Sequence, residues 1–171
     1  MLEVIIDTNI VINGIFQQKK YEDCWSMLKL LRTGEIRAVI SKQLLREYQY
    51  VPLKVILNKL QKQGINKNTN IPDLLNDFFQ YSTDITELTF NAKLVAVTSK
   101  KEGCIDPEDN KIYNLAFDSN CTLVITKNIS DFYPLIESNV KTKNGKEIKF
   151  YTPDQFLTNY KIIKWAESKK A

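Results

Sequence analysis

The most informative stretch of the chain is IDPEDNKIYNLAFDSNCTLVITKNISDF, at residues 105–132. It predicts an acidic loop and then a helix that begins at Asp106–Pro107 and ends at Asn120. Asp is a favoured N-cap, Pro fits the first helical position, and Asn tolerates a left-handed C-cap. The apolar run at 123–125 predicts a short strand of a parallel sheet covered on both faces. Because ligands bind at the carboxyl ends of such strands, the acids around this unit are candidates for a site.

The acids of this stretch also have a structural explanation. Asp106 and Asp109 would cap the helix or balance its dipole, and Asp131 would cap the next turn. A functional interpretation therefore requires acids from distant parts of the chain to converge on the same place.

Two further acids follow predicted strands earlier in the chain. The strand at 2–6 ends at Asp7, and the strand at 36–40 leads into a helix at 42–60 that carries Glu47 in its second turn. Both residues have simpler alternatives, since Asp7 would cap the helix after it and Glu47 would be a surface residue. In a parallel sheet, however, the same positions would bring both acids to the edge where ligands bind.

The rest of the chain continues the alternation of strands and helices. It predicts helices at 21–32 and from Pro72, a basic turn at 141–149, a short strand at 148–151, and a short helix after the capping box Thr152–Gln155. The helix from Pro72 would bury Leu74, Leu75, Phe78 and Phe79, and Pro52 would kink or divide the helix at 42–60. Segment 86–103 fits a strand and an extended loop equally. Such alternation predicts an α/β fold with a mainly parallel sheet.

Length and composition indicate one globular domain. The chain has 171 residues, of which 43% are hydrophobic and 26% charged, which is typical of globular proteins. We expect the domain to span residues 1–160, with a C-terminal tail at 161–171. No stretch has the apolar length of a membrane span, and Glu3 and Asp7 do not suit a signal peptide. We therefore expect a cytoplasmic protein without a membrane partner.

The chain contains no histidine, which excludes a histidine general base, a Ser–His or Cys–His nucleophile pair, and any histidine metal site. Its three cysteines are far apart and match neither a disulfide framework nor a zinc motif, so we expect reduced thiols at Cys24, Cys104 and Cys121. An enzyme of this composition must use carboxylates, lysines or a metal held by oxygen. The net charge of +4 is compatible with a polyanionic partner.

The order and spacing of the acids resemble those of the PIN-domain family of metal-dependent nucleases, in its bacterial toxin-like branch. The matching segments are Asp7-Thr8-Asn9, Glu47 within 45–48, residues 106–111, residues 126–132 and the ending at 151–157. The resemblance implies a three-layer α/β sandwich with a mainly parallel central sheet. It also implies a metal-dependent endoribonuclease, a hydrolase that cuts RNA phosphodiester bonds, in the role of the toxin of a toxin–antitoxin pair.

The same resemblance implies a set of site residues. The expected catalytic residues, which are also the expected metal ligands, are Asp7, Glu47, Asp109 and Asp131. Residues of second rank are Asp106, Asn9, Thr126 and Asn128. The family often has an aspartate where Asn128 stands, and segment 64–101 matches no part of the pattern, which leaves substrate choice open. The expected cofactor is Mg²⁺ or Mn²⁺, because clustered carboxylates repel each other without a cation and these ions prefer oxygen ligands.

The expected partners are RNA, a small antitoxin protein and a second copy of the chain in a homodimer. We predict RNA contacts at Lys141, Lys143 and Lys146, since the chain is most basic from residue 141 onward. A solubilising tail explains these lysines equally well. The lysines between Lys54 and Lys67 form the next candidate surface.

Three other classes share parts of this pattern. An aspartate phosphatase usually has a second aspartate where Asn9 stands, and a receiver domain needs an acidic pair after the first strand, where only Asp7 is present. A catalytically silent PIN-like module that binds nucleic acid or protein is the remaining alternative. The presence of all four acids argues against that alternative.

Overall fold

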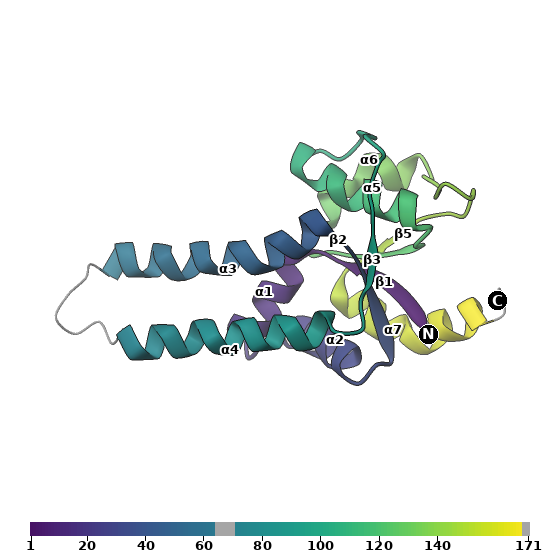
Figure 1. Cartoon of the computed structure of the whole chain (residues 1–171). Helices are drawn as coiled ribbons and strands as arrows, with labels where there is room; N and C mark the ends of the chain where they lie inside the picture. Colours follow the sequence, from purple (N-terminus) through teal and green to yellow (C-terminus); the bar gives the residue numbers. More distant parts are fainter. Residues whose placement is uncertain (64–70, 169–171) are drawn as a thin grey trace.

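The computed structural model of the chain describes residues 1–63 and 71–168 (Figure 1), with the side chains at 52, 55–63, 71–75, 77–78 and 167–168 left undescribed. Its centre is a five-stranded sheet in the order β3-β2-β1-β4-β5, and every neighbouring pair is parallel. The strands are β1 (Leu2–Ile6), β2 (Ile36–Ser41), β3 (Lys93–Val95), β4 (Leu123–Ile125) and β5 (Lys149–Tyr151). The predicted α/β fold with a parallel sheet is confirmed.

Helices cover both faces of this sheet. They are α1 (Thr8–Phe16), α2 (Glu22–Arg32), α3 (Lys42–Gln63), α4 (Ile71–Thr89), α5 (Asn110–Ser119), α6 (Tyr133–Glu137) and α7 (Pro153–Ser168), with 3₁₀ turns η1 (Pro107–Asp109) and η2 (Ile129–Phe132). The chain steps from β1 out to β3 and then returns across the sheet to β4. Because parallel crossovers are right-handed, α5 lies on the face opposite α1 and α2 (Figure 1).

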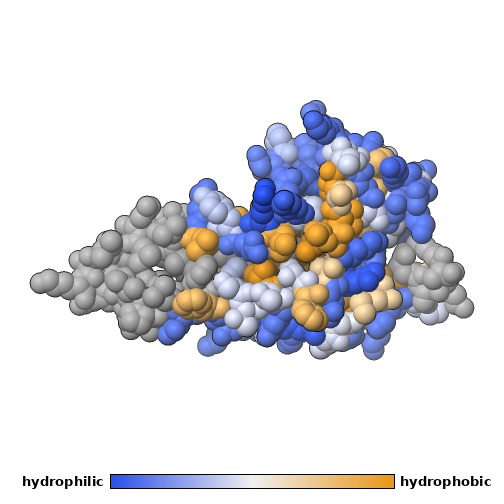
Figure 2. Space-filling view, in the orientation of Figure 1, coloured by the Kyte–Doolittle hydropathy of each residue, from blue (hydrophilic) through white to orange (hydrophobic). Residues whose placement is uncertain are grey.

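The central strands are buried because helices cover them from both sides. Val4, Ile5 and Val124 are fully buried, as expected for apolar strands in a parallel sheet. β3 is an edge strand, and its Leu94 is 65% exposed. Figure 2 shows apolar side chains gathered over this strand on one face of the molecule.

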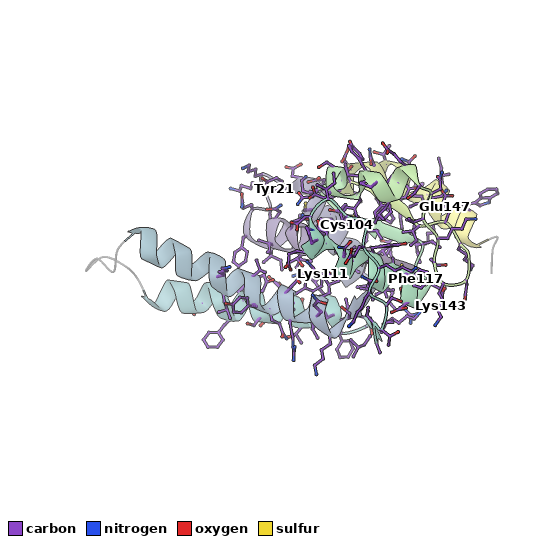
Figure 3. The ribbon with its side chains drawn as sticks, turned by 90° about the horizontal axis from the view of Figure 1, so that it is seen from above. Tyr21, Cys104, Lys111, Phe117, Lys143 and Glu147 are labelled. Carbon is purple, nitrogen blue, oxygen red and sulfur yellow. The ribbon has the colours of Figure 1, made fainter. Side chains whose placement is uncertain are left out.

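Helices α3 and α4 run side by side away from the sheet (Figures 1 and 3). α3 continues through Pro52, so this proline does not divide the helix. Phe79 is 63% exposed rather than buried, because α4 packs through a different stripe formed by Tyr81, Ile85 and Leu88. The predictions for Leu74, Leu75 and Phe78 concern side chains outside the described set.

The helix ends and the irregular segments agree with the predictions in part. Asn120 ends α5 in the left-handed region at φ 58°, as predicted. The ambiguous segment 86–103 contains the end of α4, strand β3 and an irregular stretch. Helix α7 is longer than predicted and reaches Ser168, so the expected tail from 161 begins within it, and Ile163 there is buried. None of the described helices is long and apolar enough to cross a membrane.

Candidate active site at the carboxyl ends of the strands

Asp7 lies where β1 ends beside β4. Its backbone N–H donates to the carbonyl of Ile125 at 2.9 Å, which continues the ladder between the two strands by one residue. The carboxylate is 5% exposed, and its Oδ2 accepts a hydrogen bond of 2.7 Å from the hydroxyl of Thr126. Thr126 is fully buried and its Oγ1 accepts the N–H of Asn128 at 3.0 Å. Thr126, just after β4, therefore fixes the orientation of the Asp7 carboxylate at the end of β1.

Asp109 reaches the same edge from the opposite face of the sheet. It ends η1, immediately before α5, and is 8% exposed. The pKa of its carboxyl is raised to about 6, mainly by burial and then by the charge of Asp7, with smaller effects of Asp106 and Asp131. Burial also raises the pKa of Asp7, although the Thr126 hydroxyl and the charge of Lys111 oppose the increase. The predicted carboxylates Asp7, Asp109 and Asp131 thus share one electrostatic field.

Cys104 lies against the same group of acids. Burial, followed by the charges of Asp109, Asp131 and Asp106, raises the pKa of this thiol to about 12. The thiol is therefore protonated at neutral pH, so it is not a nucleophile.

Asp131 and Asp106 differ in their surroundings. Asp131 is half-buried in η2. Its backbone carbonyl accepts the N–H of Ile105 at 2.8 Å, and this hydrogen bond joins the segment before η1 to the loop that follows β4. Asp106 is exposed, and its Oδ1 accepts the N–H of Glu108 at 2.9 Å. The N-cap predicted for Asp106 is confirmed, and this role explains the residue without a catalytic one.

Glu47 is held by partners that the sequence did not indicate. Its Oε2 accepts from the Thr8 hydroxyl at 3.1 Å, and its Oε1 lies 3.3 Å from the ammonium of Lys111. Thr8 follows Asp7 directly and Lys111 closely follows Asp109. The only signal for either residue was therefore its position beside a predicted acid. Through these two contacts Glu47 joins α3 to the segments that carry Asp7 and Asp109.

The segment between β3 and η1 is fastened to one face of α5. Asn110, Asn114 and Asp118 are spaced four residues apart on this helix, and each accepts backbone N–H groups of the segment. Asn114 binds Lys101 twice, through its Oδ1 at 2.7 Å and its Nδ2 at 2.9 Å. These side chains, which the sequence analysis missed, position the turn that carries Asp109.

The lysines predicted to bind RNA lie elsewhere. Lys141, Lys143 and Lys146 are exposed in the turn before β5, where Lys141 and Glu147 form an antiparallel bridge. The N–H of Lys143 donates to the carbonyl of Phe117 at 3.1 Å, near the C-terminal end of α5. Figure 3 shows Phe117 and Lys143 close together, with Lys111 apart from both. The acids lie at the other end of this helix.

The residues fit a hard divalent cation by their donor chemistry. All side-chain donors are oxygen atoms, and the buried Oδ1 of Asn9, two residues after Asp7, has no hydrogen-bond partner in the described part of the chain. Within residues 1–63 and 71–168, however, no three His, Cys, Asp or Glu side chains stand in an arrangement ready to hold a metal ion. The candidate oxygen donors are therefore gathered at one edge of the sheet without being preassembled.

Comparison with known proteins agrees with this architecture. Residues 3–130 match the family model described as PIN domain, so the chain belongs to the PIN domain family. PIN domains are generally nucleases, which are hydrolases that bind nucleic acid, and they usually use divalent metals. The chain is also similar to an uncharacterized protein of Methanocaldococcus jannaschii, with 28% identity over 161 residues that cover 93% of this chain and 92% of the relative. No solved structure matches the chain.

Proposed function

We propose that this protein is a Mg²⁺- or Mn²⁺-dependent endoribonuclease. The observation that supports the proposal best is the carboxyl of Asp109, which is buried beside Asp7 and has its pKa raised to about 6. Burying several acids together is unfavourable unless a cation joins them, and such perturbed carboxyls are typical of functional sites. In a PIN domain, this arrangement at the carboxyl ends of parallel strands favours a nuclease over a catalytically silent module.

In this proposal Asp7, Asp109 and Asp131 hold the cation, with Asn9 as an additional oxygen donor. Glu47 is the fourth carboxylate of the site, and its two oxygens are engaged by Thr8 and Lys111. The bound ion would supply an activated water and stabilise charge on the attacked phosphate. The chain's own groups position the ligands: Thr126 fixes Asp7, and Asn128 fixes Thr126 through its N–H. A phosphodiester chain is polyanionic, so basic residues must hold it near these acids.

The deciding experiment compares RNA cleavage by the parent protein and the Asp7→Asn variant. Asparagine nearly keeps the shape of the side chain and can still accept the hydroxyl of Thr126 at its amide oxygen. We expect Mn²⁺ to stimulate RNA cleavage by the parent and EDTA to abolish it. The cleavage rate of the variant should fall by a factor of about 10² or more, while its circular dichroism spectrum stays native. Equal cleavage by both proteins would refute the assignment of Asp7.

The proposal extends to partners. The ending at 151–157 resembles that of the toxin-like branch, which supports a small antitoxin as an inhibitory partner. The exposed Leu94 on edge strand β3 supports a homodimer through this edge. Sedimentation of the purified chain, alone and with the product of any adjoining small gene, tests both associations.

A further inference from the structure

Lys111 places a positive charge among the acids of the site. It is the second residue of α5, and its side chain is 12% exposed. The ammonium lies 3.3 Å from Glu47 Oε1 and 2.8 Å from the backbone carbonyl of Glu108. Figure 3 shows Lys111 in the body of the molecule near Cys104, away from the exposed basic turn at Lys143.

The charge of Lys111 also acts on the aspartates. It lowers the pKa of Asp7 and of Asp109, so its positive charge acts on both carboxyls while the ammonium itself pairs with Glu47. Lys127, which follows Thr126 at the same edge of the sheet, is instead paired with Asp23 at 2.9 Å. Lys111 is therefore placed to balance the acids of this site, whereas Lys127 is engaged elsewhere.

We propose that Lys111 is the resident counter-ion of the metal-free site, anchored there by Glu47, and that it competes with a divalent cation for the aspartates. This inference rests on the proposed metal site and adds how that site is controlled. Two cations beside the same carboxylates repel each other, so a divalent ion binds fully only when the ammonium withdraws. The ammonium already pairs with Glu47 rather than with an aspartate, and the flexible stem of lysine lets it move farther from the aspartates when a divalent ion enters.

Glu47 then acts as a positioning residue. Both of its carboxylate oxygens already have partners, since Thr8 donates to one and Lys111 pairs with the other. Glu47 thus affects the cation mainly through the position of Lys111.

The first test is Mn²⁺ binding by the full chain, measured by calorimetry without RNA. Lys111→Met removes the charge and keeps an unbranched stem, so we expect Mn²⁺ to bind about tenfold tighter or better, because a like charge has left the site. Lys111→Arg keeps the charge and should bind as the parent does. Lys127→Met is the matched control, because Lys127 is a salt-bridged lysine of the same edge, and it should leave the affinity unchanged.

The second test separates an anchor from a ligand at Glu47. If Glu47 anchors Lys111, Glu47→Gln releases the ammonium toward the aspartates and weakens Mn²⁺ binding in the parent background. The same change has no effect once Lys111→Met is present. If Glu47 is a direct ligand, its replacement weakens binding by a similar factor in both backgrounds.

Several outcomes would overturn the inference. Unchanged or weaker Mn²⁺ binding by Lys111→Met would do so, as would equal effects of Glu47→Gln in the two backgrounds or the absence of Mn²⁺ binding in every variant. If Lys111→Met does not fold, Lys111→Gln keeps a donor for the Glu108 carbonyl and gives the same comparison. A protein that binds Mn²⁺ as expected but cleaves no RNA refutes the ribonuclease proposal and leaves this inference standing.

Discussion

Two neighbouring acids of the 3₁₀ turn should respond oppositely to mutation. Asp106 caps the turn through Glu108, whereas Asp109 makes no capping hydrogen bond with its side chain. Replacing Asp109 by Asn removes a buried charge that Asp7 repels, so we expect the metal-free protein to be stabilised by about 1–3 kcal/mol at neutral pH. Thermal unfolding in EDTA measures the difference. Asp106→Ala is the control and should lose about 1 kcal/mol, the usual value of a cap.

The effect of Asp109→Asn should depend on pH with a definite sign. The folded-state pKa of Asp109 is raised from 3.8 to about 6, so the folded protein retains a proton that the unfolded chain releases. Stability contributed by this group is therefore present below the unfolded value and is lost as the pH rises toward 6 and above. Asparagine is neutral at every pH, so the melting temperatures of parent and variant should converge near pH 3.8 and differ most from about pH 6 upward. A constant difference between these two pH values would contradict the raised pKa.

At the residue scale, the sequence identified the acids but not the groups that hold them. Asp7, Asp109 and Thr126 could be predicted because strand ends and helix starts are visible in the local pattern. The hydrogen bond between Thr126 and Asp7 joins residues 119 positions apart, so only the resemblance could suggest it. Thr8 and Lys111 were missed because their importance arises from Glu47 on another element.

At the scale of elements, Asn114 is the middle one of three side chains on α5 that hydrogen-bond to the irregular segment before η1. Asn114→Ala removes both hydrogen bonds to Lys101 and one of 2.7 Å to the carbonyl of Asn110. We expect a loss of about 1 kcal/mol, because the partly buried backbone groups of Lys101 are left without these partners. Hydrogen exchange at residues 99–105 should quicken, and RNA cleavage should fall because the turn with Asp109 is less well positioned.

A matched control keeps this prediction specific. Thr83→Ala removes a hydroxyl that donates to the carbonyl of Phe79 on the exposed side of α4. It should change neither exchange at 99–105 nor cleavage. If Asn114→Ala leaves hydrogen exchange at 99–105 unchanged, the hydrogen bonds from the side chains of α5 do not hold this segment in place.

The sequence predicted α5 and left the segment beside it ambiguous for a physical reason. Helix caps and an apolar stripe are local signals, and they located the start of this helical unit and its end at Asn120. The segment from 96 onward has no regular period, and its backbone groups bond to side chains of α5 rather than to a strand. A pattern within the segment therefore could not show where it lies.

At the scale of the whole molecule, the alternation of strands and helices predicted the parallel sheet but not the order of its strands. That order determines which residues meet. The return from β3 across the sheet to β4 places β4 beside β1, and Asp7 beside Thr126. It also sends α5 along the opposite face, with the acids at its start and the basic turn at its end. The sequence showed both ends of α5 without showing that the basic turn contacts the end remote from the acids, one helix length of about 15 Å away.

This separation makes the role of the basic turn testable. We propose that Lys141, Lys143 and Lys146 hold RNA away from the cleavage point, since Lys143 contacts the end of α5 remote from Asp109. Reversing the three charges to glutamate should weaken binding of a long RNA and reduce its salt dependence, with a slope lower by about 2 because about 0.7 counterions are released per phosphate contact of a single strand. Cleavage of a short RNA that covers only the acids should change little. Binding is measured with the Asp7→Asn variant, so that cleavage does not interfere.

If long and short RNAs lose affinity equally, the turn acts through the general electrostatic field of the protein. If neither changes, the turn does not contact RNA, and the surface that begins at Lys54 becomes the site to test.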